Sequence, residues 1–189
     1  MIKKFFIILK AIITGKNYLP NEKIKNISYL NLNKLKDKKI TNIIFDIDQT
    51  LTYYRTSKIP KDIENKIKKM NNFKLCAISN YNYNSKKRKK REQEIEKKYG
   101  IKVIHSNKQK PNPIAFEKCM NYMKSNSKNT AMIGNTLFTD ILGANRLNLY
   151  TILVEEIDEK LPITVKIINK IDKKIYKSHK SRFSKKEFE

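Results

Sequence analysis

The chain has 189 residues, of which 39% are hydrophobic, so it is long enough for one domain with a single core. Its formal net charge of +24 excludes a weakly charged surface and favours polyanionic partners, namely nucleic acid, anionic lipid or phosphorylated substrates. Abundant Lys, Asn and Ile also fit AT-rich codon bias, which lowers the weight of that charge. Cys76 and Cys119 have no metal-ligand spacing, and we expect both to be reduced and buried.

The first residues, "MIKKFFIILKAIITGK", contain an apolar run over residues 5–13 that Lys10 interrupts. No small-residue cleavage site follows, and the run is far shorter than the roughly 20 residues that cross a bilayer. Two readings stay open: a helix along a membrane interface, or a terminal helix packed on the domain. We assign residues 1–39 to an N-terminal basic amphipathic segment that leads into the domain.

Five apolar runs beyond residue 40 predict buried strands: "ITNIIFDI", "FKLCAIS", "IKVIHS", "TAMIG" and "YTILVEE". Between them lie longer amphipathic stretches, expected to be helical, at about 60–71, 86–99, 112–124 and 138–148. Strands that alternate with helices predict an α/β fold, a three-layer, Rossmann-like parallel sheet with helices on both faces. We place this domain at residues 40–158.

Two basic segments are expected to be helical. Six consecutive basic residues, 86–91, open the second crossover helix, either as a solvated face or as a surface for a phosphate-rich partner. In the segment 159–189, Ile167, Ile168, Ile171 and Ile175 lie on one helical face with lysines around them. This C-terminal basic amphipathic helix either docks on the domain or rests on an anionic membrane.

Polar side chains follow several of the predicted strands. Asp46 and Asp48 end the first strand, Ser79 and Asn80 end the second, and Asn135 follows the fourth. Right-handed crossovers place the carboxyl ends of parallel strands at one edge of a sheet, where open α/β folds bind ligands. Asn80 serves equally well as a turn-forming residue.

The two aspartates suit hydrolysis of a phosphate monoester. Asp46 can attack phosphorus and form an aspartyl-phosphate, and Asp48, two residues on in extended chain, points to the same side and can move the proton. A carboxylate that approaches a phosphate dianion needs a cation, and Mg²⁺ accepts carboxylate, carbonyl and phosphate oxygens.

Other residues complete this chemistry. Ser79 can hold phosphoryl oxygens, and Lys110, in the loop after the third strand, can neutralise charge on phosphate and nucleophile. Asp140 or Asn135 can complete the metal shell. Asp140 also has a simpler reading, as an acid that favours a helix N-terminus.

These residues resemble the haloacid dehalogenase superfamily of aspartate-nucleophile phosphatases. Its D-x-D-x-T motif matches Asp46-Ile-Asp48-Gln-Thr50, its second motif matches Ser79, and its third matches Lys110. The stretch "GNTLFTDILGANRLNLYTILV" is similar to the YqeG-like branch, which is related to phosphatidylglycerophosphate phosphatases. The resemblance covers about residues 17–157, and the gaps between motifs leave no room for a large cap domain.

The resemblance implies a Mg²⁺-dependent phosphatase with Asp46 and Asp48 as catalytic residues. It places Thr50, Ser79, Asn80 and Lys110 on the phosphate, and Asp46, Asp48, Asn135 and Asp140 at the metal. This chain has Asn135 where the family pattern has aspartate, so the ligand is an amide oxygen without negative charge, and metal affinity is expected to be weaker.

An open site suits a large or surface-bound substrate, and the resemblance favours phosphatidylglycerophosphate, with peripheral contact to an anionic membrane from the cytoplasmic side. Two alternatives remain. One is a soluble phosphatase for a nucleotide, sugar phosphate or phosphoprotein. The other is a non-enzymatic module that binds RNA or lipid, although nucleic acid is not the favoured partner.

Overall fold

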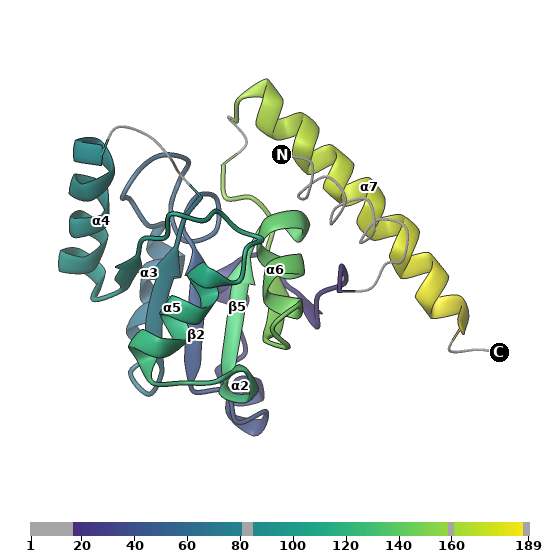
Figure 1. Cartoon of the computed structure of the whole chain (residues 1–189), viewed down its shortest axis with the longest axis horizontal. Coiled ribbons are helices and arrows are strands. Elements are labelled where there is room, and N and C mark those ends of the chain that lie inside the picture. Colours follow the sequence, from purple (N-terminus) through teal and green to yellow (C-terminus); the bar gives the residue numbers. More distant parts are fainter. Residues whose placement is uncertain (1–16, 81–84, 159–160, 187–189) are drawn as a thin grey trace.

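A parallel sheet between two layers of helices forms the centre of the protein (Figure 1). The computed structural model describes residues 17–80, 85–158 and 161–186. Within those ranges six strands pair in the order β1-β6-β5-β2-β3-β4, and every pair is parallel. The strands are β1 (Glu22–Lys23), β2 (Asn42–Asp46), β3 (Lys74–Ile78), β4 (Lys102–Ile104), β5 (Thr130–Gly134) and β6 (Tyr150–Leu153).

All five predicted strands are confirmed as β2 to β6. β2 and β5 are buried along their whole length, as the uninterrupted apolar pattern of a central parallel strand requires. β1 was not predicted, because its two charged residues carry no strand pattern. It forms by pairing with β6 at the edge of the sheet, where Glu22 lies opposite Ile152.

Helices connect the strands and cover both faces of the sheet (Figure 1). The predicted helices at 60–71, 86–99 and 112–124 correspond to α3, α4 and α5, whereas the fourth is divided between η3, a π-helical turn, and α6. The helical elements are η1 (Ile27–Tyr29), α2 (Leu32–Asp37), α3 (Lys61–Lys68), α4 (Ser85–Tyr99), α5 (Ile114–Met123), η2 (Ser127–Asn129), η3 (Leu137–Ile141), α6 (Leu142–Asn145) and α7 (Ile163–Lys186).

Side chains that alternate along the strands divide the core between the two faces. On β2, Ile43 and Phe45 pack on the layer of α2, α3 and α4, whereas Ile44 packs on the layer of α5 and α6. Cys76 and Cys119 lie buried and free in the second cluster, as expected. The fold class predicted from the alternation of strands and helices is therefore confirmed.

The helix α3 illustrates how the sequence sets each covering element. Ile63 and Ile67, one turn apart, are its buried residues and pack on the sheet. Acidic Asp62 and Glu64 occupy the first turn, and Lys66 and Lys68 the last turn, which complements the helix dipole at both ends.

The chain before residue 40 packs on the domain wherever it is described. Tyr18, Ile27, Leu30 and Leu35 are buried, and β1 extends the sheet. The expectations for residues 1–16 lie outside the described residues. The division at residues 39 and 158 stays a prediction.

α7 runs along the α6 side of the domain and extends beyond it (Figure 1). It is attached near its middle: the Tyr18 hydroxyl donates to Asp172 over 2.7 Å, and Ile175 packs on the cluster around Leu137. Ile167 and Ile171 are exposed, so the apolar face predicted for this helix is only partly covered by the domain. Within the described ranges, no helix combines the length and apolarity that a membrane crossing needs.

Candidate active site

The predicted site residues gather where the strand order reverses. From β2 the chain proceeds through β3 to β4 on one side, and β5 and β6 then lie on the other side. The connections that leave β2 and β5 therefore diverge, and open α/β sheets bind ligands in the crevice outside the carboxyl ends of such strands. Asp46 is the last residue of β2, and Asn135 follows the last residue of β5.

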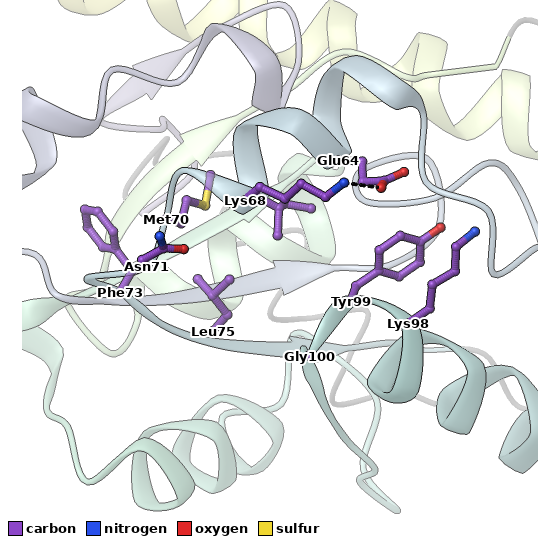
Figure 2. Close-up of a pocket in the computed structure, with 10 residues that line it drawn as sticks. Glu64, Lys68, Met70, Asn71, Phe73, Leu75, Lys98, Tyr99 and Gly100 are labelled. Carbon is purple, nitrogen blue, oxygen red and sulfur yellow. Dashed lines mark ion pairs between the residues drawn. The ribbon is translucent and has the colours of Figure 1, made fainter.

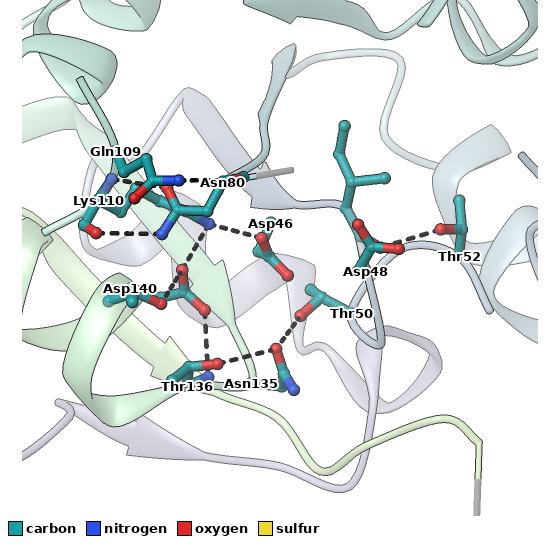
Figure 3. A network of polar contacts seen from close by, with 12 residues as sticks. Asp46, Asp48, Thr50, Thr52, Asn80, Gln109, Lys110, Asn135, Thr136 and Asp140 are labelled. Carbon is teal, nitrogen blue, oxygen red and sulfur yellow. Dashed lines mark hydrogen bonds and ion pairs between the residues drawn. The ribbon is translucent and has the colours of Figure 1, made fainter. Parts of the chain in front are cut away.

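Lys110 joins Asp46 to Asp140 in a buried ionic triad (Figure 3). Its Nζ donates to Asp46 Oδ1 over 2.5 Å and to Asp140 Oδ1 over 2.6 Å. The fractional exposures are 7% for Asp46, 3% for Lys110 and 0% for Asp140. Two carboxylates thus share one ammonium group, and the triad carries one net negative charge when all three groups are ionised.

Burial controls the ionisation of the triad. It raises the pKa of Asp46 to about 7, because desolvation and the neighbouring Asp140 outweigh the opposing attraction of Lys110. Burial lowers the pKa of Lys110, but attraction to Asp140 and Asp46 exceeds that effect, so the pKa is raised overall. Lys110 is therefore a fixed positive charge, and a second cation near Asp46 would favour its ionised form.

A glycine permits Asp140 to reach the triad. A Cβ atom on Gly134 would overlap the Asp140 carboxylate, so the residue before Asn135 must lack a side chain. Asp140 Oδ2 accepts a hydrogen bond from the Thr136 N–H over 3.1 Å. Asp140 therefore accepts a hydrogen bond at the start of η3, where the simpler reading placed it, and it also pairs with Lys110, which was not expected.

Asn135 lies on the opposite side of the triad from the Lys110 loop and faces Thr50 (Figure 3). Its Oδ1 accepts long hydrogen bonds from Thr50 Oγ1 at 3.3 Å and Thr136 Oγ1 at 3.4 Å. Thr50 is fully buried, whereas Asn135 is only half-buried. The amide oxygen is thus held by two hydroxyl groups, in a side chain that is only partly buried.

Asn80 fixes the loop that carries Lys110. Its Nδ2 donates to the Lys110 carbonyl over 3.0 Å, and its Oδ1 accepts from the Lys110 N–H over 2.6 Å. The Lys110–Pro111 peptide bond is cis. Both polar atoms of the Asn80 side chain therefore bind the backbone of Lys110. Ser79 is half-buried and directly follows β3, at the same edge of the sheet.

Asp48 pairs with Arg91 of α4, whereas Asp46 pairs with Lys110. Arg91 Nη2 donates to Asp48 Oδ1 over 2.8 Å, and Nη1 donates to Oδ2 over 3.0 Å. Arg91 is 7% exposed although it ends the run of six basic residues. Neither reading of that run, a solvated face or a surface for a partner, therefore describes Arg91.

Sequence reasoning missed Arg91, but its spacing held a signal. Arg91 precedes the buried Ile95 by four residues and the half-buried Tyr99 by eight, so the three share one helical face. An arginine on the apolar stripe of a helix needs an anionic partner, and Asp48 is that partner.

The oxygen ligands at the crevice fit a hard divalent cation. Asp46 and Asp140 offer carboxylates and Asn135 offers an amide oxygen, while Asp48 is engaged by Arg91. In residues 17–80, 85–158 and 161–186, no three His, Cys, Asp or Glu side chains gather as a metal cluster. Mg²⁺ is commonly held by one or two carboxylates with several waters, so two carboxylates are sufficient for it.

A separate pocket of about 290 Å³ lies at the other edge of the sheet (Figure 2). Met70 and Phe73 line it just before β3, and Gly100 lines it just before β4. Because the strands are parallel, their amino ends face away from the Asp46 crevice. This pocket therefore plays no part in the chemistry of the triad.

Comparisons with known proteins show the family of the chain. The family model described as mitochondrial PGP phosphatase matches residues 2–157. The chain belongs to this phosphatase family. It is also 32% identical over 156 residues to a probable phosphatase, YqeG, of Bacillus subtilis strain 168, which covers 82% of this chain and 80% of that protein. The resemblance to the YqeG-like branch of the haloacid dehalogenase superfamily is thus confirmed.

Solved structures give more distant likenesses. An uncharacterized protein from Listeria monocytogenes serotype 4b is 22% identical, with a TM-score of 0.48, over 65% of this chain and 85% of that chain. A haloacid dehalogenase-like family hydrolase from Xanthomonas campestris is 10% identical, with a TM-score of 0.39, over 71% of this chain and 98% of that chain.

Proposed function

We propose that this phosphatase hydrolyses the phosphate monoester of phosphatidylglycerophosphate through an aspartyl-phosphate on Asp46, with Mg²⁺ as cofactor. The observation that carries the proposal is the Asp46–Lys110–Asp140 triad at the strand-order reversal, in a chain that belongs to the PGP phosphatase family. A nucleophile, a fixed positive charge and a second carboxylate meet there, as transfer of a phosphoryl group to a carboxylate requires.

In the first step, an Asp46 oxygen forms a bond to phosphorus while the bond from phosphorus to the leaving alcohol oxygen breaks. Asp48 gives that oxygen its proton. Lys110, which is held 2.5 Å from Asp46, keeps the nucleophile in place and offsets charge on the phosphoryl oxygens. Thr50 and Ser79 border the same crevice, and we assign them to the phosphoryl group.

In the second step, water attacks phosphorus, the bond between Asp46 and phosphorus breaks, and inorganic phosphate leaves. Asp48 now takes a proton from the water, so it returns to the protonation state in which it began. Mg²⁺, when bound, offsets the repulsion between the carboxylate nucleophile and the phosphate dianion. Asp46, Asn135 and Asp140 would hold it through oxygen atoms, and Asp48 is the further residue proposed for the metal.

The lack of a cap domain in the described residues favours a substrate that is presented by a surface. In the described residues, the connection from β2 to β3 carries α3, and the connection from β3 to β4 carries α4, with no separate cap domain on either. A small metabolite gains from enclosure by such a cap, whereas a lipid headgroup is held in place by its membrane.

α7 supports contact with an anionic membrane. Ile163, Ile167 and Ile171 recur every four residues and are 75%, 53% and 53% exposed. Exposed lysines, among them Lys166 and Lys170, lie between them. Apolar side chains flanked by lysines bind an anionic bilayer by burial in the acyl region and by attraction to the headgroups.

The decisive experiment compares phosphate release from vesicles that contain phosphatidylglycerophosphate with release from soluble monoesters, with Mg²⁺ present. We expect much faster turnover of the lipid, and loss of activity in Asp46→Asn. Equal rates on lipid and soluble esters would favour the soluble phosphatase. No release with Mg²⁺, Mn²⁺ or Co²⁺ would leave the non-enzymatic binding module.

A pair of variants separates membrane contact from catalysis. Ile167→Ser with Ile171→Ser should lower turnover of the lipid in vesicles and leave a soluble aryl phosphate unaffected. Tyr122→Ser, which removes an exposed aromatic side chain from α5, is the matched control and should change neither rate. An unchanged rate on vesicles in the double variant would contradict the role of α7.

A further inference from the structure

Arg91 makes an array of hydrogen bonds that surrounds one side of Asp48. Besides the two bonds to the Asp48 carboxylate, its Nη2 donates to Thr52 Oγ1 over 3.0 Å and its Nε donates to the Thr56 carbonyl over 2.7 Å. One guanidinium thus ties α4 to three points of the segment after β2. Such a planar fork restricts both the position and the rotation of a carboxylate.

The two oxygens of Asp48 are not equivalent in this arrangement. Oδ1 accepts from Arg91 Nη2 and also from the Arg55 backbone N–H, over 2.7 Å. Oδ2 accepts only from Arg91 Nη1 among the hydrogen bonds of Asp48 in the described structure. Because each carboxylate oxygen has about two acceptor positions, Oδ1 is saturated and Oδ2 keeps one position for a proton.

The side chain of Arg91 is held rigidly enough to define that oxygen. It is almost fully buried, and its helix is anchored on the sheet by Ile95, which is fully buried one turn later. The Asp48 carboxylate shares Arg91 Nη2 with the Thr52 hydroxyl, whereas the Lys110 ammonium pairs with Asp46 and Asp140. Arg91 of α4 and the Arg55 backbone N–H, rather than Lys110, therefore orient Asp48.

We infer that Arg91 is a positioning residue for the proton transfer by Asp48: its fork selects Oδ2 as the oxygen that gives the proton to the leaving alcohol and later takes it from water. This inference rests on the proposed function. Arg91 does not touch the reacting phosphoryl group, and it acts through Asp48 alone.

The leaving group provides the test, because an acidic leaving group departs without a proton and an alcohol does not. The measured quantity is kcat/KM for sn-glycerol 3-phosphate and for 2,4-dinitrophenyl phosphate, in the full chain with Mg²⁺. Arg91→Gln should lower the value for the alkyl ester by about 100-fold and the value for the aryl ester by about 3-fold or less. The ratio of the two values does not depend on the folded fraction of the variant.

Matched variants complete the test. Arg88→Gln changes an arginine one turn earlier, which pairs with Glu92 at 3.5 Å, and should leave both values unchanged. Arg91→Lys keeps the charge without the fork and should lie between wild type and Arg91→Gln. In an Asp48→Asn background, Arg91→Gln should cause no further change in the ratio.

The outcomes separate this inference from the proposed function. Equal losses on both esters in Arg91→Gln, or a further change in the ratio in the Asp48→Asn background, would show that Arg91 is merely structural and overturn the inference alone. A wild-type chain that hydrolyses neither ester nor the lipid would overturn both.

Discussion

The two aspartates of the D-x-D motif lie two residues apart, yet opposite layers of the protein hold them. Asp46 pairs with Lys110, from the loop that leads into α5, whereas Asp48 pairs with Arg91 of α4 on the other face of the sheet. Lys110 is shared with a second carboxylate, and Arg91 serves one carboxylate with a planar fork. Asp46, the proposed nucleophile, is thus held beside a second carboxylate that shares its cation, and Asp48, the proposed proton-transfer group, is held by a bidentate pair.

Of the changes that separate the two aspartates, loss of Asp46, the proposed nucleophile, should lower activity most. Asp46→Asn is expected to lower kcat by at least about 10⁴-fold, because an amide cannot form the phosphoryl intermediate. Rapid acid quenching should trap a phosphorylated protein in the wild type and none in the variant. Asp62→Asn, at an acidic residue in the first turn of α3, is the control. A trapped phosphoryl group in Asp46→Asn would place the nucleophile elsewhere.

Removal of the Lys110 ammonium should lower the stability of the fold more than removal of the Arg91 guanidinium. Lys110→Met leaves two buried carboxylates without a partner and should lower the free energy of unfolding by about 3–5 kcal/mol. Arg91→Gln leaves the more exposed Asp48 and should cost about 1–3 kcal/mol. Urea unfolding measures both values, with the exposed Lys108→Met as control. A larger loss of unfolding free energy in Arg91→Gln than in Lys110→Met would contradict the view that the Lys110 ion pairs are the more buried ones.

Asn135 tests the metal side of the triad. Asn135→Asp adds a negative charge where an amide oxygen now lies, so the concentration of Mg²⁺ that half-saturates activity should fall by about 10-fold. The Mg²⁺-dependent rise in Tm gives a second measure that does not need turnover. Asn71→Asp, at the opposite edge of the sheet, is the control. An unchanged Mg²⁺ requirement would place Asn135 outside the metal shell.

The smallest effect concerns pH. The pKa of Asp46 is raised from 3.8 to about 7, so the folded protein binds more protons than the unfolded chain between these values, and stability falls as the pH rises through them. Without Mg²⁺, the Tm of Asp46→Asn relative to wild type should therefore rise from pH 5 to pH 7. We expect about 1 kcal/mol per pH unit, or about 2–4 °C. A difference in Tm that is constant with pH would contradict the raised pKa.

Much of the fold could be predicted because its signals are local. The apolar runs of β2 to β6 and the turn-spaced isoleucines of α3 are properties of adjacent residues, and they define strands and helices before any tertiary contact is considered. β1 could not be predicted, since two charged residues become a strand only when β6 offers its edge. The division of the fourth helix into η3 and α6 was not predicted either, and the Asp140 side chain bonds the Thr136 N–H at the start of η3.

By itself, the sequence determined which residues end the strands and, through the order of its motifs, which phosphatase family the chain belongs to. Only the tertiary structure decided how those residues share their charges: Lys110 between Asp46 and Asp140, Asn80 on the Lys110 backbone, and Arg91 on Asp48. Strand and family signals are encoded over a few neighbouring residues, whereas an ion pair depends on burial and distance between segments far apart in the chain. Asp48 and Arg91 are 43 residues apart, and folding alone brings them within 2.8 Å.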